Sequence, residues 1–279
     1  MTLSIAHLGP SGTNTEAAAM AYANWLSQTG QEAILCPYPS IAQTLRATAQ
    51  GQAHLAVVPV ENSIEGSVVI TLDTLWQLDM LQIQQALVLP VTNALISRAE
   101  SLAAIQTVYS HPQALAQCQR WLEQFLGESV QLIPSNSTTE ALQHLNEDRT
   151  IAAIASPRAA QLYNLPMLAH PINDYPDNCT RFWVMGLQSS TGGSYTSLGF
   201  SVPANVPGAL VKPLQVFASR GINLSRIESR PTKRSLGDYL FFVDLEADPT
   251  QSAFQSALVE LRAYTETLKI FGSYTIVSV

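Results

Sequence analysis

The chain has 279 residues, of which 47% are hydrophobic, and this is enough for two or three compact units. Residues 1–195 contain six Arg, no Lys and fourteen Asp and Glu, a net charge of −8, whereas residues 196–279 carry eight basic and seven acidic residues. The larger part therefore has neither the basic surface that nucleic-acid binding requires nor the amine that Schiff-base chemistry requires. We expect no nucleic-acid partner.

Signals for export and for metal binding are also lacking. The first residues, MTLSIAHLGPSG, do not show the basic segment and apolar stretch of a signal peptide, and no later run approaches about 18 apolar residues. Cys36, Cys118 and Cys179 are far apart and have no CxxC spacing, which argues against a disulfide framework or a zinc site. We expect a cytoplasmic protein with no membrane partner, no metal and no other cofactor.

The first half of the chain alternates strand and helix patterns. A strand pattern at 3–8 meets a Gly-Pro-Ser-Gly turn, and Thr13 and Glu16 then form a capping box for a helix. The next predicted elements are a helix over 41–50, a strand over 55–58 and a helix over 69–78. The alternation predicts a parallel α/β sheet, and a long extended segment at 84–95 is expected to cross to a second lobe.

A second α/β set follows the crossing. Its predicted elements are strands at 106–109, 130–133 and 151–154, helices at 113–126 and 138–146, a return crossing at 168–173 and a strand at 180–185. Polar clusters follow five of the strands of the two lobes: GPSGT, PVENSIEGS, SHPQ, SNSTT and SPR. Because ligands of open α/β sheets collect beyond the carboxyl ends of strands, we expect a ligand cleft between the lobes.

The tail is predicted to be a separate unit. A Gly/Ser/Thr-rich stretch at 187–195 is typical of a linker, which divides the chain into units 1–186 and 196–279. Predicted strands at 197–202, 222–228, 239–245 and 270–277 and helices at 207–219 and 253–268 give the order βαββαβ, a ferredoxin-like fold. Pro207 suits a first helical turn, but Pro213 conflicts with the interior of that helix.

Six motifs carry a family resemblance that covers nearly the whole chain. They are GPSGT at 9–13, ENSIEG at 61–66, SHPQALAQC at 110–118, TRF at 180–182, GAL at 208–210 and ESRP at 228–231. In this order and spacing they resemble the prephenate dehydratases that carry a C-terminal ACT regulatory domain; Asn14 and Asn173 depart from the family pattern. The resemblance implies an α/β, bilobal catalytic unit similar to type II periplasmic-binding-protein lobes. It also implies a carbon–oxygen lyase of phenylalanine biosynthesis that converts prephenate to phenylpyruvate, CO2 and water.

The same resemblance implies residue roles. Thr180 would donate a hydrogen bond or a proton to the leaving hydroxyl, with the origin of the proton open. Ser110 and Gln117, seven residues apart, are expected to share one helix face. Arg181 is expected to bind a substrate carboxylate or, alternatively, to pair with Asp174 or Asp177. The catalytic positions are Thr180, Glu61, Asn62, Ser110 and Gln117, and the substrate contacts are Thr13, Ser63, Arg181 and Phe182.

The tail motifs imply a phenylalanine effector site formed by two subunits of a homodimer or homotetramer. Its residues are Gly208, Ala209, Leu210, Asn223, Leu224, Glu228, Ser229, Arg230 and Pro231. Two other functions stay open at this point. One is an arogenate dehydratase, which handles the same ring, and the other is a non-catalytic amino-acid sensor, because a two-lobed α/β cleft also occurs in solute-binding proteins.

Overall fold

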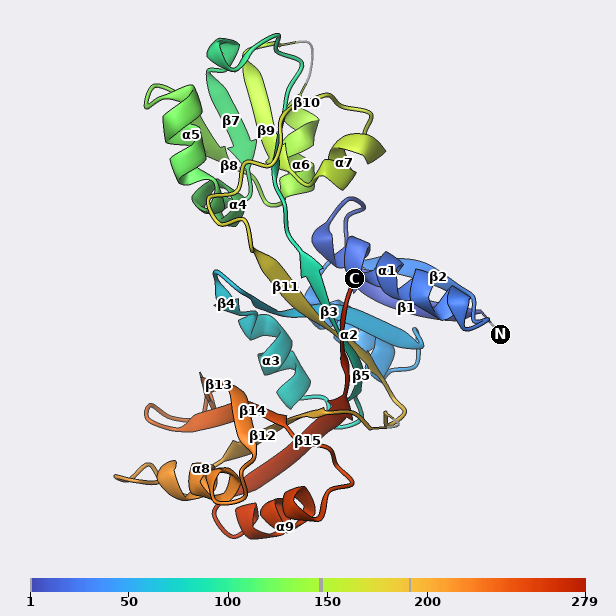
Figure 1. Cartoon of the computed structure of the whole chain (residues 1–279), viewed down its shortest axis with the longest axis vertical. Helices are drawn as coiled ribbons and strands as arrows, with labels where there is room; N and C mark the ends of the chain where they lie inside the picture. The colour runs from blue at the N-terminus through green and yellow to red at the C-terminus, as the bar shows by residue number, and fades with distance from the viewer. Residues whose placement is uncertain (1, 146–147, 191) are drawn as a thin grey trace.

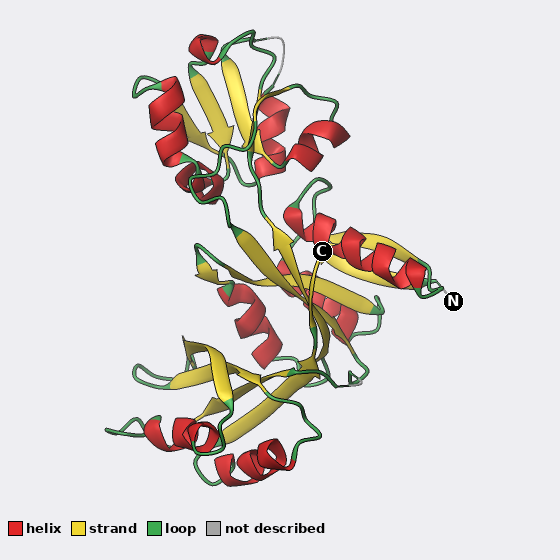
Figure 2. Cartoon of the chain, viewed as in Figure 1, coloured by secondary structure: helices red, strands yellow, loops and turns green. Residues whose placement is uncertain are grey.

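The computed structural model describes residues 2–145, 148–190 and 192–279. Figure 1 shows three units along the long axis, with one lobe in the middle, a second lobe above it and the C-terminal unit below. Figure 2 shows a sheet with helices packed on it in each unit. The predicted end of the helix over 138–146 lies outside the described residues.

The central sheet is mixed, whereas the sequence predicted a parallel sheet. Strands β1, β2 and β3 are parallel, but β11 runs antiparallel between β3 and β5. The chain leaves for the second lobe along β5 and returns along β11, so β11 must oppose its neighbours. The order is β16 (Ile276–Ser278), β5 (Gln82–Pro90), β11 (Cys179–Gly186), β3 (Leu55–Asn62), β1 (Leu3–Leu8) and β2 (Ala33–Tyr38), with β4 (Gly66–Ser67) beside β3.

The helices of this lobe start where the sequence predicts. They are α1 (Asn14–Gln28), α2 (Ile41–Ala49) and α3 (Val69–Trp76). Thr13 caps α1 by accepting a hydrogen bond from the Glu16 N–H, and Ser40 caps α2 in the same way. The capping box is not completed in its usual form, because the Glu16 carboxylate accepts from the Gly12 N–H at 2.7 Å.

The second lobe has a five-stranded sheet in which β7 is parallel to β8 and β9. The order is β10 (Met167–Ala169), β6 (Ala94–Ile96), β9 (Ile151–Ala155), β7 (Thr107–Ser110) and β8 (Gln131–Pro134). Its helices are α4 (Pro112–Gln117), α5 (Gln119–Leu126), α6 (Thr138–Ala141) and α7 (Pro157–Leu162), with short 3-10 turns at Leu102–Ala104 and Leu142–His144.

The prediction of one helix over 113–126 is wrong, because the helix is divided at Cys118. The carboxylate of Asp174 accepts hydrogen bonds from the backbone N–H groups of Arg120 and Trp121, both at 3.0 Å. Cys118 itself has no side chain that can cap α5. A residue more than fifty positions away therefore starts the second helix.

The C-terminal unit confirms the predicted order βαββαβ. It consists of β12 (Tyr195–Ser201), α8 (Val211–Ala218), β13 (Asn223–Pro231), β14 (Tyr239–Glu246), α9 (Ser252–Leu261) and β15 (Thr267–Tyr274). Its antiparallel sheet has the order β13-β14-β12-β15. Helix α8 starts at Val211, so Pro213 lies in the first turn, where N–H groups have no partner within the helix. This shorter helix removes the predicted conflict.

The C-terminal unit shares a hydrophobic core with the central lobe. Phe242 and Phe271 of its sheet lie in one cluster with Trp183, Met185 and Leu75 of the central lobe. The last strand, β16, leaves the C-terminal unit and pairs in parallel with β5 of the central sheet. The two units are therefore joined by packing as well as by the chain.

Candidate active site

Asn62 and Thr180 form the centre of a buried polar cluster at the end of the central sheet nearest the second lobe. They lie opposite each other in the pairing of β3 with β11. The Asn62 Nδ2 atom donates to three oxygens. These are Thr180 Oγ1 at 3.0 Å, Asn178 Oδ1 at 2.8 Å and the Cys179 carbonyl at 3.1 Å. The Asn62 Oδ1 atom accepts two backbone N–H groups of the following turn, which fixes the orientation of the amide.

The hydroxyl hydrogen of Thr180 is free to bind a ligand. Within residues 2–145, 148–190 and 192–279, Asn62 is the only hydrogen-bond partner of the Thr180 hydroxyl, and Asn62 is the donor. An oxygen that accepts one hydrogen bond becomes a better donor through its own hydrogen. Thr180 is only 8% exposed, so this donor lies in an environment where electrostatic interactions are strong.

Asn178 connects this cluster to the second lobe. Its Nδ2 atom donates to Gln117 Oε1 at 3.1 Å, and the Gln117 carbonyl accepts from the Asp174 N–H at 2.9 Å. Three of the predicted catalytic residues, Asn62, Gln117 and Thr180, are thus brought together. The sequence analysis missed Asn178; its only local signal is its place two residues before Thr180.

Ser110 and Ser63 have structural partners. The prediction that Ser110 and Gln117 share one helix face is wrong, because Ser110 is the last residue of β7 and only Gln117 lies in α4. Its hydroxyl is fully buried and donates to the Ile154 carbonyl at 2.7 Å. The Ser63 hydroxyl accepts from the Cys179 N–H at 3.0 Å and so holds the turn after β3 against β11.

The structure gives Glu61, Arg181 and Phe182 partners outside the Thr180 cluster. Arg181 lies on the opposite face of β11, where its Nη2 is 2.8 Å from Glu61 Oε2 and 2.6 Å from Asp244 Oδ2. Among the described residues, the ion-pair partners of Arg181 are therefore Glu61 and Asp244 and not Asp174 or Asp177. Phe182 is buried in the core between the sheet and α1.

The charge of Arg181 is secured by its partners. Burial alone lowers the pKa of its guanidinium, but the negative charge of Asp244 and then the contributions of Tyr274 and Glu61 raise that pKa above its ordinary value overall. Arg181 is therefore charged and paired inside the protein.

The GPSGT segment joins the two lobes. The Thr13 hydroxyl caps α1 and donates to the Leu8 carbonyl, so both of its roles are structural. The Glu16 carboxylate pairs with Arg158 of α7 at 2.8 Å, and the Gly12 carbonyl accepts from the Ser156 hydroxyl. Gly12 has a φ of +91°, and a Cβ there would lie 3.2 Å from the Cβ of Ala159, so glycine permits this close approach.

Two hydroxyls of the SNSTT segment are further candidates for ligand contacts. Ser135 Oγ and Thr139 Oγ1 are buried and have no hydrogen-bond partner among the residues that the structure describes. Thr139 also lies beside Gly12, since its Cγ2 atom is 3.6 Å from the position of a Gly12 Cβ. Among the described residues, no group of three His, Cys, Asp or Glu is arranged to hold a metal ion.

Comparison with known proteins identifies the family of the chain. A family model described as "Prephenate dehydratase" matches residues 5–190, and a model described as "ACT domain" matches residues 196–263. The chain belongs to the prephenate dehydratase family. Its activity is that of a prephenate dehydratase, a lyase that converts prephenate to phenylpyruvate, CO2 and water.

Relatives match almost the whole chain. A bifunctional chorismate mutase/prephenate dehydratase of Aquifex aeolicus is 42% identical over 98% of this chain and 73% of its own length. A prephenate dehydratase of Lactococcus lactis subsp. cremoris is 34% identical over 99% of both chains.

Solved structures of the family share the fold. The prephenate dehydratase of Arthrobacter aurescens in complex with L-Phe has a TM-score of 0.86 and 35% identity, over 98% of this chain and 90% of its own. GqqA, described as a quorum-quenching acylase, also matches, with a TM-score of 0.79 and 29% identity over 97% of both chains. The second case shows that activity must be argued from the site and not from the fold.

The ACT domain of this prephenate dehydratase places the predicted effector residues on two faces of β13. Glu228 accepts a hydrogen bond from Ser67 at 3.0 Å, and Arg230 pairs with Asp73 of α3 at 3.0 Å, so both face the central lobe. Asn223 and Ser229 are exposed. In the described part of one chain, no hydrogen bond or ion pair joins the 208–210 segment to the 228–231 segment.

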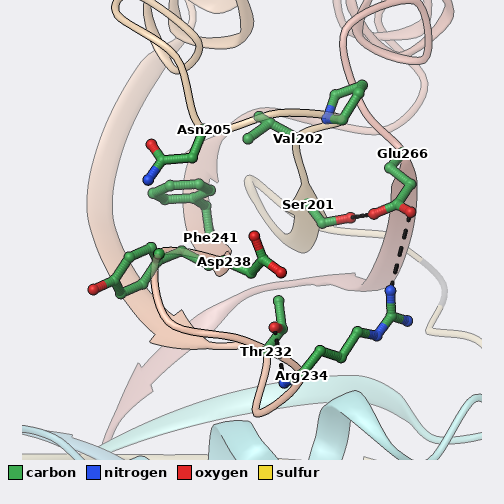
Figure 3. Close-up of a pocket in the computed structure, with 11 residues that line it drawn as sticks. Ser201, Val202, Asn205, Thr232, Arg234, Asp238, Phe241 and Glu266 are labelled. Atoms are coloured by element: carbon green, nitrogen blue, oxygen red, sulfur yellow. Dashed lines mark hydrogen bonds and ion pairs between the residues drawn. The ribbon is translucent and has the colours of Figure 1, made fainter.

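The ACT domain also contains a small polar pocket of about 150 Å³, shown in Figure 3. It lies between the end of β12, the β13–β14 hairpin and the start of β15, and none of the predicted effector residues lines it. Its lining consists of Ser201, Val202, Pro203, Asn205, Thr232, Arg234, Gly237, Asp238, Tyr239, Phe241 and Glu266.

Proposed function

We propose that the Asn62–Thr180 cluster is the dehydration site and that prephenate binds with its ring hydroxyl against Thr180. The observation that carries this proposal is the Thr180 hydroxyl, which accepts from Asn62 and has its own hydrogen free. In the reaction, the electron pair of the ring C–carboxylate bond becomes a ring double bond as CO2 leaves, and the hydroxyl departs. A hydrogen bond from Thr180 stabilises the negative charge that develops on that oxygen, and proton transfer to it yields water.

The contact between the lobes supports the same reaction. Ion pairing of Glu16 with Arg158 and packing of Gly12 on Ala159 hold the GPSGT segment against α7. Closure of the lobes around the substrate removes water from its ring carboxylate, and a poorly hydrated carboxylate loses CO2 more readily. No electron sink is needed, because formation of the aromatic ring drives the reaction.

The test is product formation by the purified protein from prephenate or from arogenate. Phenylpyruvate is measured by the absorbance of its enol in alkali, and phenylalanine formed from arogenate is measured by chromatography. We expect phenylpyruvate from prephenate, and we expect added phenylalanine to suppress it. Product from arogenate as well would show that the site also accepts the amino-acid form of the substrate, and phenylpyruvate formation that added phenylalanine does not suppress would contradict the proposed inhibition.

We further propose that phenylalanine binds between two ACT domains of a homodimer or homotetramer. The solved relative from Arthrobacter aurescens is described in complex with L-Phe. Strand β13 is an edge of its sheet, and an unpaired edge can extend the sheet into a second subunit. Sedimentation velocity tests the oligomer.

We place the protein in the cytoplasm. Among the described residues, no helix is long and apolar enough to cross a membrane.

Gly208→Ala tests the effector site. Gly208 has a φ of +82°, so alanine strains the segment that precedes α8, and we expect at least about tenfold weaker inhibition by phenylalanine. Gly30→Ala is the matched control, because Gly30 has a φ of +83° in the central lobe and equally open surroundings. Ser229→Ala is expected to act like Gly208→Ala. Unchanged inhibition in both ACT variants would place the effector elsewhere.

A further inference from the structure

A buried ionic network joins the ACT domain to the face of the central sheet opposite Thr180. Arg181 is its centre, bonded to Glu61 of β3 at 2.8 Å and to Asp244 of β14 at 2.6 Å. The side chain of Arg181 is 12% exposed and that of Asp244 is 1% exposed. Asp244 is held in turn by the Ser197 hydroxyl at 2.6 Å.

Each of the two central-lobe members of this network is the chain neighbour of a member of the Thr180 cluster. Arg181 follows Thr180, and Glu61 precedes Asn62. In the pairing of β11 with β3, Arg181 lies opposite Glu61 and Phe182 lies opposite Pro59. Val60 is therefore an extra residue, and β3 has a bulge there. A bulge redirects the side chains beside it, and here the backbone at the bulge carries Arg181 and Glu61 next to Thr180 and Asn62.

The ACT domain contributes a second cation to the network from the strand that carries the proposed effector residues. Arg226 of β13 is 5% exposed in its side chain; its Nη1 is 3.5 Å from Asp244 and its Nε is 3.7 Å from Glu61. Within the described part of the chain these two nitrogens have no hydrogen-bond partner, although Nη2 donates to Ser67 at 2.7 Å. Removing one charge from such a buried group leaves the others uncompensated, so its members rearrange together.

We propose that Asp244 is a positioning residue for Thr180, acting through Arg181 and Glu61, and that this network carries the effect of ACT-domain occupancy to the active site. In one arrangement of the network Asp244 holds Arg181, and in the other it does not. The effector acts because its affinity for the ACT domain differs between these two arrangements. The inference rests on the proposed roles of Thr180 and of phenylalanine. It adds the physical connection between them.

The test is the steady-state kinetics of Asp244→Asn in the whole chain, with prephenate and with or without phenylalanine. We expect kcat to fall at least about tenfold with KM for prephenate within about twofold of wild type, because Asp244 does not touch substrate. We expect phenylalanine to lose its effect on the remaining activity. A merely structural role for Asp244 would lower the melting temperature and leave kcat per folded molecule and inhibition unchanged.

Asp79→Asn is the matched control. It removes another ion pair between the central lobe and the ACT domain, with Lys269, which does not connect to Thr180. We expect wild-type kcat and wild-type inhibition in this control. Equal loss in both variants would show that any weakening of the domain contact suffices, and this would overturn the inference.

A mutant cycle with Arg181→Lys tests the route. If Asp244 acts through Arg181, the double variant loses no more kcat than the worse single variant, whereas independent losses that multiply contradict the proposal. If Asp244→Asn does not fold, Ser197→Ala replaces it. This substitution removes the hydroxyl that holds Asp244 and also contacts the Tyr274 hydroxyl at 2.7 Å, while it keeps the Asp244 charge, and we expect a smaller change in the same direction. The network is refuted if Asp244→Asn, or Ser197→Ala where that variant replaces it, has wild-type kcat and wild-type inhibition. If Thr180→Val is inactive in the same assay, the proposed function stays intact.

Discussion

At the scale of single residues, the proposed chemistry depends on how one amide is oriented. The Asn62 Oδ1 atom accepts two backbone N–H groups, so Nδ2 must point toward Thr180 and Asn178. The Thr180 hydroxyl accepts from Asn62, so its own hydrogen is left to be donated to a ligand. A leaving hydroxyl requires such a donor.

Thr180→Val should lower kcat by about 100-fold or more, because it removes a positioned donor while keeping the branched shape of the side chain. Thr180→Ser retains the hydroxyl and should retain most of the activity. Turnover of prephenate by both variants, with their melting temperatures as a check on folding, decides the point. Activity near wild type in Thr180→Val would remove Thr180 from the mechanism.

At the scale of elements, the helices show which boundaries depend on local sequence. Helices α1 and α2 start at caps that lie next to them in the sequence, at Thr13 and Ser40. Helix α5 starts at hydrogen bonds from Asp174, on the segment that returns from the second lobe. Its start therefore depends on the folded arrangement of that lobe.

Asp174→Ala should destabilise the protein by about 1 kcal/mol, since it leaves two N–H groups at the start of α5 without their partner. Chemical denaturation measures this change in the free energy of unfolding. Asp177→Ala is the control: Asp177 is exposed, its side chain has no described hydrogen bond or ion pair, and its replacement should be nearly neutral. A neutral Asp174→Ala would mean that water replaces the cap at no cost.

At the scale of the whole molecule, two contacts organise the three units. One is the core that the ACT domain shares with the central lobe, including the pairing of β16 with β5. The other is the contact of the GPSGT segment and the first turn of α1 with α7, which includes the ion pair of Glu16 with Arg158. Burial raises the pKa of Glu16, but the Gly12 N–H and Arg158 lower it more, so the pKa lies below the ordinary value of 4.5.

The contact between the lobes should therefore weaken in acid. A lowered pKa means that Glu16 contributes its full stabilisation above about pH 4.5, and that this contribution is lost as the pH falls through the lower folded-state pKa. The melting temperature of wild type should exceed that of Glu16→Gln at neutral pH, and the difference should shrink below about pH 4.5. Glu32→Gln, which replaces an exposed acid of the same lobe, is the control for the loss of one carboxylate. A constant difference for Glu16→Gln would contradict the assignment.

Local signals in the sequence determined much of this protein. The strand and helix patterns, the caps at Thr13 and Ser40 and the order βαββαβ depend on residues close in the chain. The motifs around Asn62 and Thr180 indicated the family and the residues of the site that we propose. Tertiary structure alone decided the rest, because it depends on partners distant in sequence. Asp174 divides a helix that has a continuous pattern, and Asn178 links Asn62 to Gln117 across the lobes. Arg181, next to Thr180 in the chain, lies on the other face of the strand because successive strand residues alternate, and it is paired with Asp244 of a different domain.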